Sequence, residues 1–117
     1  MITGVDHFAI IVSSEEVVSF YKKLGFKEVF RKKRSHDTVV LLDGFGIRME
    51  IFIDPRHPMR ATKPENLGLR HLALKVDRIE KTAEELKIKM GTIQNDWMGV
   101  RFAYTKDPDG NVVELHE

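Results

Sequence analysis

The segments GVDHFAIIVS (residues 4–13) and GLRHLALKVD (residues 68–77) decide the fold, because they align without a gap at an offset of 64 residues. The alignment places His7 opposite His71, and the same offset matches the two halves as far as their last strands. Self-similarity at a fixed period indicates repeated structural units. The chain is therefore predicted to contain two copies of one module.

Each module is predicted to fold as βαβββ. Residues 5–12 alternate or run apolar and are rich in β-branched side chains, which is typical of a buried or half-buried strand. A helix follows, with Ser13 and Glu16 at capping-box spacing and Gly25 as its stop signal. Three shorter strands are expected after the helix, at residues 27–34, 38–42 and 47–53.

The second module repeats this order. Its helix is expected to begin with Asp77 and Glu80. An apolar stripe continues to Met90, and Gly91 is the expected stop. The later strands of this module are expected at residues 92–95, 100–106 and 111–115.

A linker is predicted between the modules, at residues 54–67, because this stretch holds three of the four prolines. The chain is accordingly expected to form one domain over residues 1–117, with modules at residues 1–53 and 68–117. The linker is long enough to reach roughly 45 Å when extended. Pairing of the modules within one chain and exchange between two chains both remain open.

The composition excludes several kinds of protein. Lysine and arginine (19) nearly balance aspartate and glutamate (18), which disfavours nucleic acid or an anionic membrane as a partner. With no cysteine, the chain forms no disulfide, thiolate metal site or cysteine nucleophile. The N-terminus lacks the features of a signal peptide, and no apolar run approaches the roughly 20 residues that span a bilayer. A cytoplasmic location is predicted.

Two histidines and two glutamates recur with the repeat. Glu50 follows His7, and Glu114 follows His71, by the same 43 residues. A lone strand histidine is usually a hydrogen-bonded core residue, and a lone strand glutamate usually faces water. The joint pattern favours one divalent metal ion instead, because these donors suit zinc, nickel, cobalt, manganese or iron. Four protein ligands leave two positions open if the ion is octahedral.

Other side chains have two possible roles each. Substrate contact is weighed against salt bridging or core packing for Arg48, Arg101, Trp97, Met98 and Phe102. The remaining histidines fall in loops or at the terminus and are assigned to the surface: His36, His57 and His116.

The motifs HFAIIV, RMEIF, GLRHLALKVD and DPDGNVVEL closely resemble the glyoxalase/bleomycin resistance/dioxygenase superfamily, also called the vicinal oxygen chelate superfamily, over essentially the whole chain. The resemblance implies an α+β fold in which two βαβββ modules pair and their curled mixed sheets form a metal-binding cleft. It also implies a homodimer. The ligand pattern is similar to that of glyoxalase I (lactoylglutathione lyase) and of compact bacterial glyoxalase-like proteins. The implied ligands are His7, Glu50, His71 and Glu114.

This resemblance implies a lyase that isomerises the hemithioacetal of methylglyoxal and a thiol through an enediolate. Glu114 is the first choice of base, and Glu50 is its counterpart. Glu50 discriminates among family members, because fosfomycin-resistance enzymes and extradiol dioxygenases lack that carboxylate. An epimerase, dioxygenase or thiol transferase using the same metal, or a metal-free small-molecule-binding module, are the alternatives.

Two positions depart from the glutathione-dependent pattern. Those enzymes generally place an arginine four residues after the first ligand and an asparagine four residues after the second. Here the positions hold Ile11 and Asp54, and neither replaces the bidentate grip of arginine on a carboxylate. The sequence therefore leaves the thiol and the native metal open.

Overall fold

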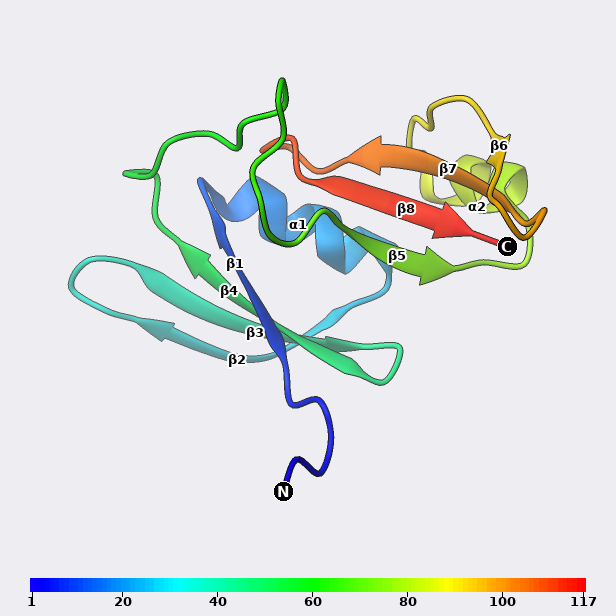
Figure 1. The fold of residues 1–117 in the computed structure, drawn as a ribbon. Coiled ribbons are helices and arrows are strands. Elements are labelled where there is room, and N and C mark those ends of the chain that lie inside the picture. The colour runs from blue at the N-terminus through cyan, green and yellow to red at the C-terminus, as the bar shows by residue number, and fades with distance from the viewer. The chain divides into compact units, whose positions relative to one another are not determined.

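The computed structural model describes all residues from Met1 to Glu117 and divides into two compact units, Met1–Pro58 and Met59–Glu117. Each unit contains one α-helix and one four-stranded sheet (Figure 1). Neither helix is long and apolar enough to cross a membrane.

The first unit has its elements in the order strand, helix and three strands. They are β1 (Phe8–Val12), α1 (Glu15–Leu24), β2 (Lys27–Lys33), β3 (Thr38–Gly44) and β4 (Ile47–Ile53). The sheet order is β1-β4-β3-β2, and β1 runs parallel to β4 while the other pairs are antiparallel.

The second unit repeats this arrangement. Its elements are β5 (His71–Lys75), α2 (Ile79–Leu86), β6 (Gln94–Asn95), β7 (Arg101–Lys106) and β8 (Val112–His116). The sheet order is β5-β8-β7-β6, with β5 parallel to β8. The predicted α+β class and the two βαβββ modules are confirmed.

The register of the parallel strands repeats at the offset found in the sequence. Ala9 is the Cα partner of Glu50, and Ala73 is the Cα partner of Glu114. β1 begins at Phe8, later than the predicted Val5, because β4 begins at Ile47 and its register leaves Val5 without a strand partner.

One face of each sheet is a hydrophobic core. In the first unit Met49 and Ile51 of β4 are fully buried, and their cross-strand partners on β3, Leu42 and Val40, are buried with them. Since side chains alternate along a strand, Glu50 projects from the opposite face. In the second unit a buried cluster comprises Ile79 of α2 together with Ala103 and Leu115. The core therefore fixes which face of each sheet carries the glutamate.

The start of α1 differs from the prediction. The N-cap is Ser14, one residue after the predicted Ser13; its backbone is extended, and its side chain makes no capping hydrogen bond. Glu15 and Glu16 lie in the first turn instead, where their charges favour the positive end of the helix dipole.

The end of α2 also differs. The helix stops at Leu86, before the predicted Met90 and Gly91, because Lys87 adopts a left-handed conformation (φ 54°). The amide of Ile88 then donates to the Ala83 carbonyl at 3.0 Å, as in a Schellman motif. Ile88 and Met90 pack against the buried cluster, so tertiary contacts end this helix.

A cluster of ion pairs on the edge strand β2 stabilises the first unit. Glu28 accepts hydrogen bonds from Arg31 and forms an ion pair with Lys22 at 2.9 Å. Arg31 and then Lys22 lower the pKa of Glu28 from 4.5 to about 2. A depressed pKa stabilises the folded state at pH values above the unfolded value, and this contribution is lost as the pH falls toward the folded value.

Replacement of Glu28 by glutamine is therefore expected to lower the free energy of unfolding by about 1 kcal/mol at pH 7, since partly exposed ion pairs are screened by water. Urea denaturation between pH 7 and pH 3 measures this difference. The free energies of unfolding of the wild type and the variant should converge as the pH drops below 4.5. An equal difference at all pH values would contradict the electrostatic origin.

Candidate metal centre

In each unit the predicted histidine lies at or just before the start of one strand, and the predicted glutamate lies in the middle of the strand parallel to it. His7 immediately precedes β1, and Glu50 lies in the middle of β4. His71 begins β5, and Glu114 lies in the middle of β8. Each glutamate is paired with a small alanine two residues after its histidine, and residues two apart share a face. The local pairing of strands thus places each histidine beside its glutamate.

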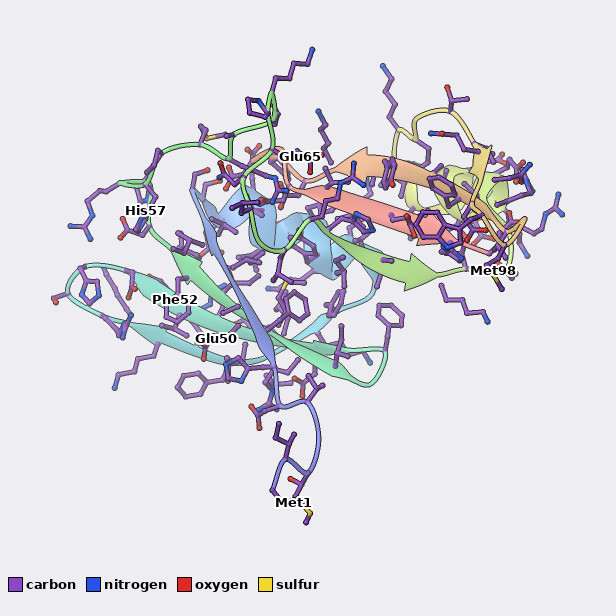
Figure 2. All side chains as sticks on the ribbon, viewed as in Figure 1. Met1, Glu50, Phe52, His57, Glu65 and Met98 are labelled. Atoms are coloured by element: carbon purple, nitrogen blue, oxygen red, sulfur yellow. The ribbon has the colours of Figure 1, made fainter.

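The first pair has its donor atoms facing each other. Nε2 of His7 lies 3.7 Å from Oε1 of Glu50, which projects from β4 (Figure 2). Nδ1 of the same ring lies 2.6 Å from Oδ1 of Asp6. An ionised carboxylate only accepts hydrogen bonds, so Asp6 holds the ring hydrogen on Nδ1. In the neutral ring this leaves the Nε2 lone pair directed toward Glu50 and available to a metal.

The carboxylates of Asp6 and Glu50 both influence the pKa of His7. The hydrogen bond to Asp6 raises the pKa of His7 above its ordinary value, and the negative charge of Glu50 adds to the effect while desolvation opposes it. The same bond lowers the pKa of Asp6. The carboxylates of Asp6 and Glu50 therefore favour a positive charge on the His7 ring.

The second pair is more buried. Nε2 of His71 lies 3.5 Å from Oε1 of Glu114, and these side chains are 23% and 11% exposed, against 39% and 27% in the first pair. The Tyr104 ring meets the His71 ring edge-on at a centroid distance of 5.5 Å. Tyr104 is also the cross-strand partner of Glu114. Burial of a carboxylate in such surroundings is costly unless it is paired or bound to a cation.

The geometry of both pairs fits a divalent cation. Two ligands about 2.1 Å from one ion lie roughly 3.0 to 3.4 Å apart, for octahedral and tetrahedral angles respectively. The observed nitrogen–oxygen separations of 3.7 and 3.5 Å are close to that spacing and longer than ordinary hydrogen bonds. The structure brings the four predicted ligands together as two pairs, and it contains no group of three or more histidine, aspartate or glutamate side chains arranged to hold a metal.

The arginines predicted as candidates for substrate contact are engaged in ion pairs. Arg48 binds its cross-strand neighbour Asp43 through two hydrogen bonds of 2.6 and 2.9 Å. Arg101 contacts Glu80 of α2 and hydrogen-bonds to Glu117 at 3.0 and 3.2 Å. These contacts place the Arg101 guanidinium on the α2 side of the sheet, the face opposite Glu114.

The aromatic candidates have different surroundings. Phe102 is half-buried, pairs across the strands with His116 and stacks edge-on with Tyr104, so it lies on the same face as Glu114. Trp97 and Met98 are exposed (97% and 79%) in the turn between β6 and β7. Met98 is labelled there in Figure 2.

The two positions that depart from the glutathione-dependent pattern also differ from each other. Ile11 is half exposed on the face of the first sheet that carries Glu50. Asp54 is buried and bound by the Arg56 side chain through two 2.9 Å hydrogen bonds, which hold the pKa of Asp54 well below its usual range.

Sequence reasoning missed two residues that contact the predicted ligands. Asp6 precedes His7 directly, and adjacency was the signal available. His116 was assigned to the surface, but it is a half-buried residue of β8, and its Nδ1 lies 2.9 Å from Oε2 of Glu114. The two-residue spacing from Glu114 on one strand face was the signal for His116.

Comparison with known proteins gives close relatives over the whole chain. Residues 4–115 match the model of the Glyoxalase/Bleomycin resistance protein/Dioxygenase superfamily. The chain is 38% identical to the uncharacterized protein YwkD of Bacillus subtilis, covering 100% of this chain and 98% of that protein. It is 39% identical to the uncharacterized protein YaeR of Escherichia coli, covering 97% of this chain and 95% of that protein.

Solved structures share the fold. A glyoxalase family protein from Enterococcus faecalis superposes with a TM-score of 0.88 at 34% identity, covering 97% of each chain. Lactoylglutathione lyase from Agrobacterium tumefaciens gives a TM-score of 0.69 at 22% identity, covering 98% and 93%. A mutant of the fosfomycin resistance protein FosX from Listeria monocytogenes was solved in complex with Mn(II) and 1S,2S-dihydroxypropylphosphonic acid. It gives a TM-score of 0.74 at 20% identity, and the match covers 99% of this chain and 92% of that chain.

Three observations point to the same family. They are the repeated βαβββ modules, the equivalent histidine–glutamate pairs, and the match to the family model over nearly the full length of the chain. This chain belongs to the Glyoxalase/Bleomycin resistance protein/Dioxygenase superfamily.

Proposed function

We propose that this protein is a divalent-metal-dependent enzyme of the glyoxalase I type. Its reaction would be the isomerisation of the hemithioacetal that methylglyoxal, or a related 2-oxoaldehyde, forms with a thiol. The observation that carries this proposal is the donor set, in which a histidine Nε2 faces a glutamate Oε1 at 3.7 Å in one unit and 3.5 Å in the other. The fold that the chain shares with lactoylglutathione lyase supports it.

The proposed ligands of one ion are His7, Glu50, His71 and Glu114. A bound cation would act as a Lewis acid toward the negative charge that develops on two adjacent substrate oxygens. Asp6 holds the His7 ring with Nε2 toward the site. Zinc, nickel, cobalt, manganese and iron all suit such donors.

Glu114 is the proposed base, with Glu50 as its counterpart in the other unit. The C–H proton leaves the carbon that bears the hydroxyl and the sulfur and returns to the neighbouring carbonyl carbon, while the hydroxyl proton passes to the former carbonyl oxygen. The product is the thioester of a 2-hydroxy acid, so atoms and electrons balance without a co-reactant. The limited exposure of Glu114 suits this role, because low exposure to water strengthens the response of a carboxylate to nearby charges.

The substrate is proposed to approach the sheet face that carries Glu114 and Phe102. Arg48 and Trp97 stay predictions for substrate contact, and so does Arg101, whose guanidinium would have to leave its ion pairs on the α2 side of the sheet to reach this face. A cytoplasmic homodimer that binds a small molecule completes the proposal.

Metal content and turnover on a panel of thiols test this function together. The purified protein is expected to hold one divalent ion per chain and to form thioester from methylglyoxal with at least one of glutathione, cysteine and 2-mercaptoethanol. Chelation should reduce the rate to background, and added Ni²⁺, Co²⁺ or Zn²⁺ should restore it. A protein that binds metal but forms no thioester has a different reaction, and a protein without metal affinity is a binding module.

A further inference from the structure

The two glutamates differ in the contacts of their second carboxylate oxygen. Oε1 of Glu114 faces His71, and Oε2 lies 2.9 Å from Nδ1 of His116. The residue two positions after Glu50 is Phe52, which projects from the same strand (Figure 2) and has no hydrogen-bond donor on its side chain. The carboxylate of the second unit is therefore held from two sides, and that of the first unit lacks the equivalent donor.

Two carboxylates lie beside the His116 ring, and one of them is hydrogen-bonded to it. An ionised carboxylate only accepts hydrogen bonds, so the His116 ring must donate from Nδ1 to Glu114. On the other side of the ring, Nε2 lies 3.4 Å from Oδ2 of Asp96, which is 17% exposed. Asp96 is itself fixed, because its Oδ1 accepts hydrogen bonds from the amides of Met98 and Val100 at 2.8 and 2.9 Å.

We propose that His116 is a positioning residue that keeps Oε1 of Glu114 directed toward His71. This inference rests on the proposed function, since it assigns His116 to the support of a ligand and base. A free glutamate side chain samples many rotamers and loses that freedom when it binds an ion. The hydrogen bond to Oε2 selects one orientation in advance. It also keeps the carboxylate in place when Oε1 accepts a proton.

Paired substitutions of His116 separate the hydrogen bond from packing. Phenylalanine reproduces the residue that the first unit carries at this position and removes the donor. Asparagine keeps an N–H donor close to the position of Nδ1. His36 lies in a loop of the first unit with a 53% exposed side chain, and His36→Phe is the matched control for loss of a histidine. The full-length protein is used throughout, without metal and with Co²⁺ as the probe.

The Co²⁺ dissociation constant is measured by competition with a chelator, and the melting temperature is measured on each metal-free variant. His116→Phe is expected to weaken Co²⁺ binding by roughly 10- to 100-fold, the usual effect of losing a partner of a metal ligand. His116→Asn and His36→Phe should stay within about threefold of wild type. If phenylalanine prevents folding, His116→Leu removes the donor with a smaller side chain.

Wild-type affinity in a folded His116→Phe or His116→Leu variant would overturn the inference. Equal weakening by asparagine and phenylalanine would also overturn it, because packing would then explain the loss. The proposed function alone fails if wild type binds Co²⁺ but forms no thioester with any thiol. Both fail if wild type does not bind Co²⁺.

Discussion

Replacement of Glu114 by glutamine is expected to lower kcat by about 10²- to 10⁴-fold, the range that general acid–base catalysis contributes. Glutamine keeps the size of the side chain and an oxygen for the ion, but it does not accept a proton at neutral pH. The His116 ring is able to shift its hydrogen to the other nitrogen and accept from the amide, so the contact at Oε2 survives the change. Turnover should therefore fall far more than metal binding.

Steady-state rates at saturating metal, with metal content measured on the same samples, provide the test. Glu50→Gln is the matched control, because it changes the equivalent side chain of the other unit. If Glu114 is the base, Glu50→Gln should lose less turnover at saturating metal. Undiminished activity of Glu114→Gln would exclude its role, and a larger loss in Glu50→Gln would exchange the roles of the two residues.

The fold was predictable because its information is local and repeated. Apolar alternation in β4 buries Met49 and Ile51, and this alone places Glu50 on the opposite face. The same offset then predicted the second module, and in the structure the register of Ala73 with Glu114 repeats that of Ala9 with Glu50. The order of the elements was therefore predictable from the sequence, and the pairing of the strands came from the structure.

The errors arose where tertiary contacts override local signals. Gly91 was the predicted stop of the second helix, but packing of Ile88 against the buried cluster ends α2 at Leu86. The amide of Gly91 instead donates to the Tyr104 carbonyl at 2.8 Å. A glycine allows the backbone conformation that ends a helix, but it does not force the helix to end there.

The candidate site was predictable at the level of pairs. His71 and Glu114 are neighbours because β5 and β8 pair, as β1 and β4 do in the first unit. His116 was missed because the last strand was expected to end at Leu115, whereas β8 continues to His116. Because the strand is one residue longer than expected, His116 lies on the same face of β8 as the predicted ligand Glu114. The joining of one pair with the other depends on module packing, which residue spacing does not encode, and this makes it an experimental question.

Substitution of either His7 or His71 by alanine is expected to abolish stoichiometric metal binding, because both pairs are proposed to serve one ion. The loss of affinity should exceed the roughly 10- to 100-fold that follows loss of an outer partner. Metal content after dialysis at a fixed free-ion concentration measures it, and His57→Ala is the control. Two independent sites would behave differently, since each variant would then keep the metal of the intact pair.

Mixing the two inactive variants separates assembly within one chain from assembly between two. If the first unit of one chain and the second unit of its partner share each ion, a dimer of His7→Ala with His71→Ala holds one intact site and one doubly altered site. A random mixture should then recover about a quarter of the wild-type sites and turnover, since half of the dimers are mixed. Sites formed within a single chain would each keep one alanine, and no activity would return on mixing.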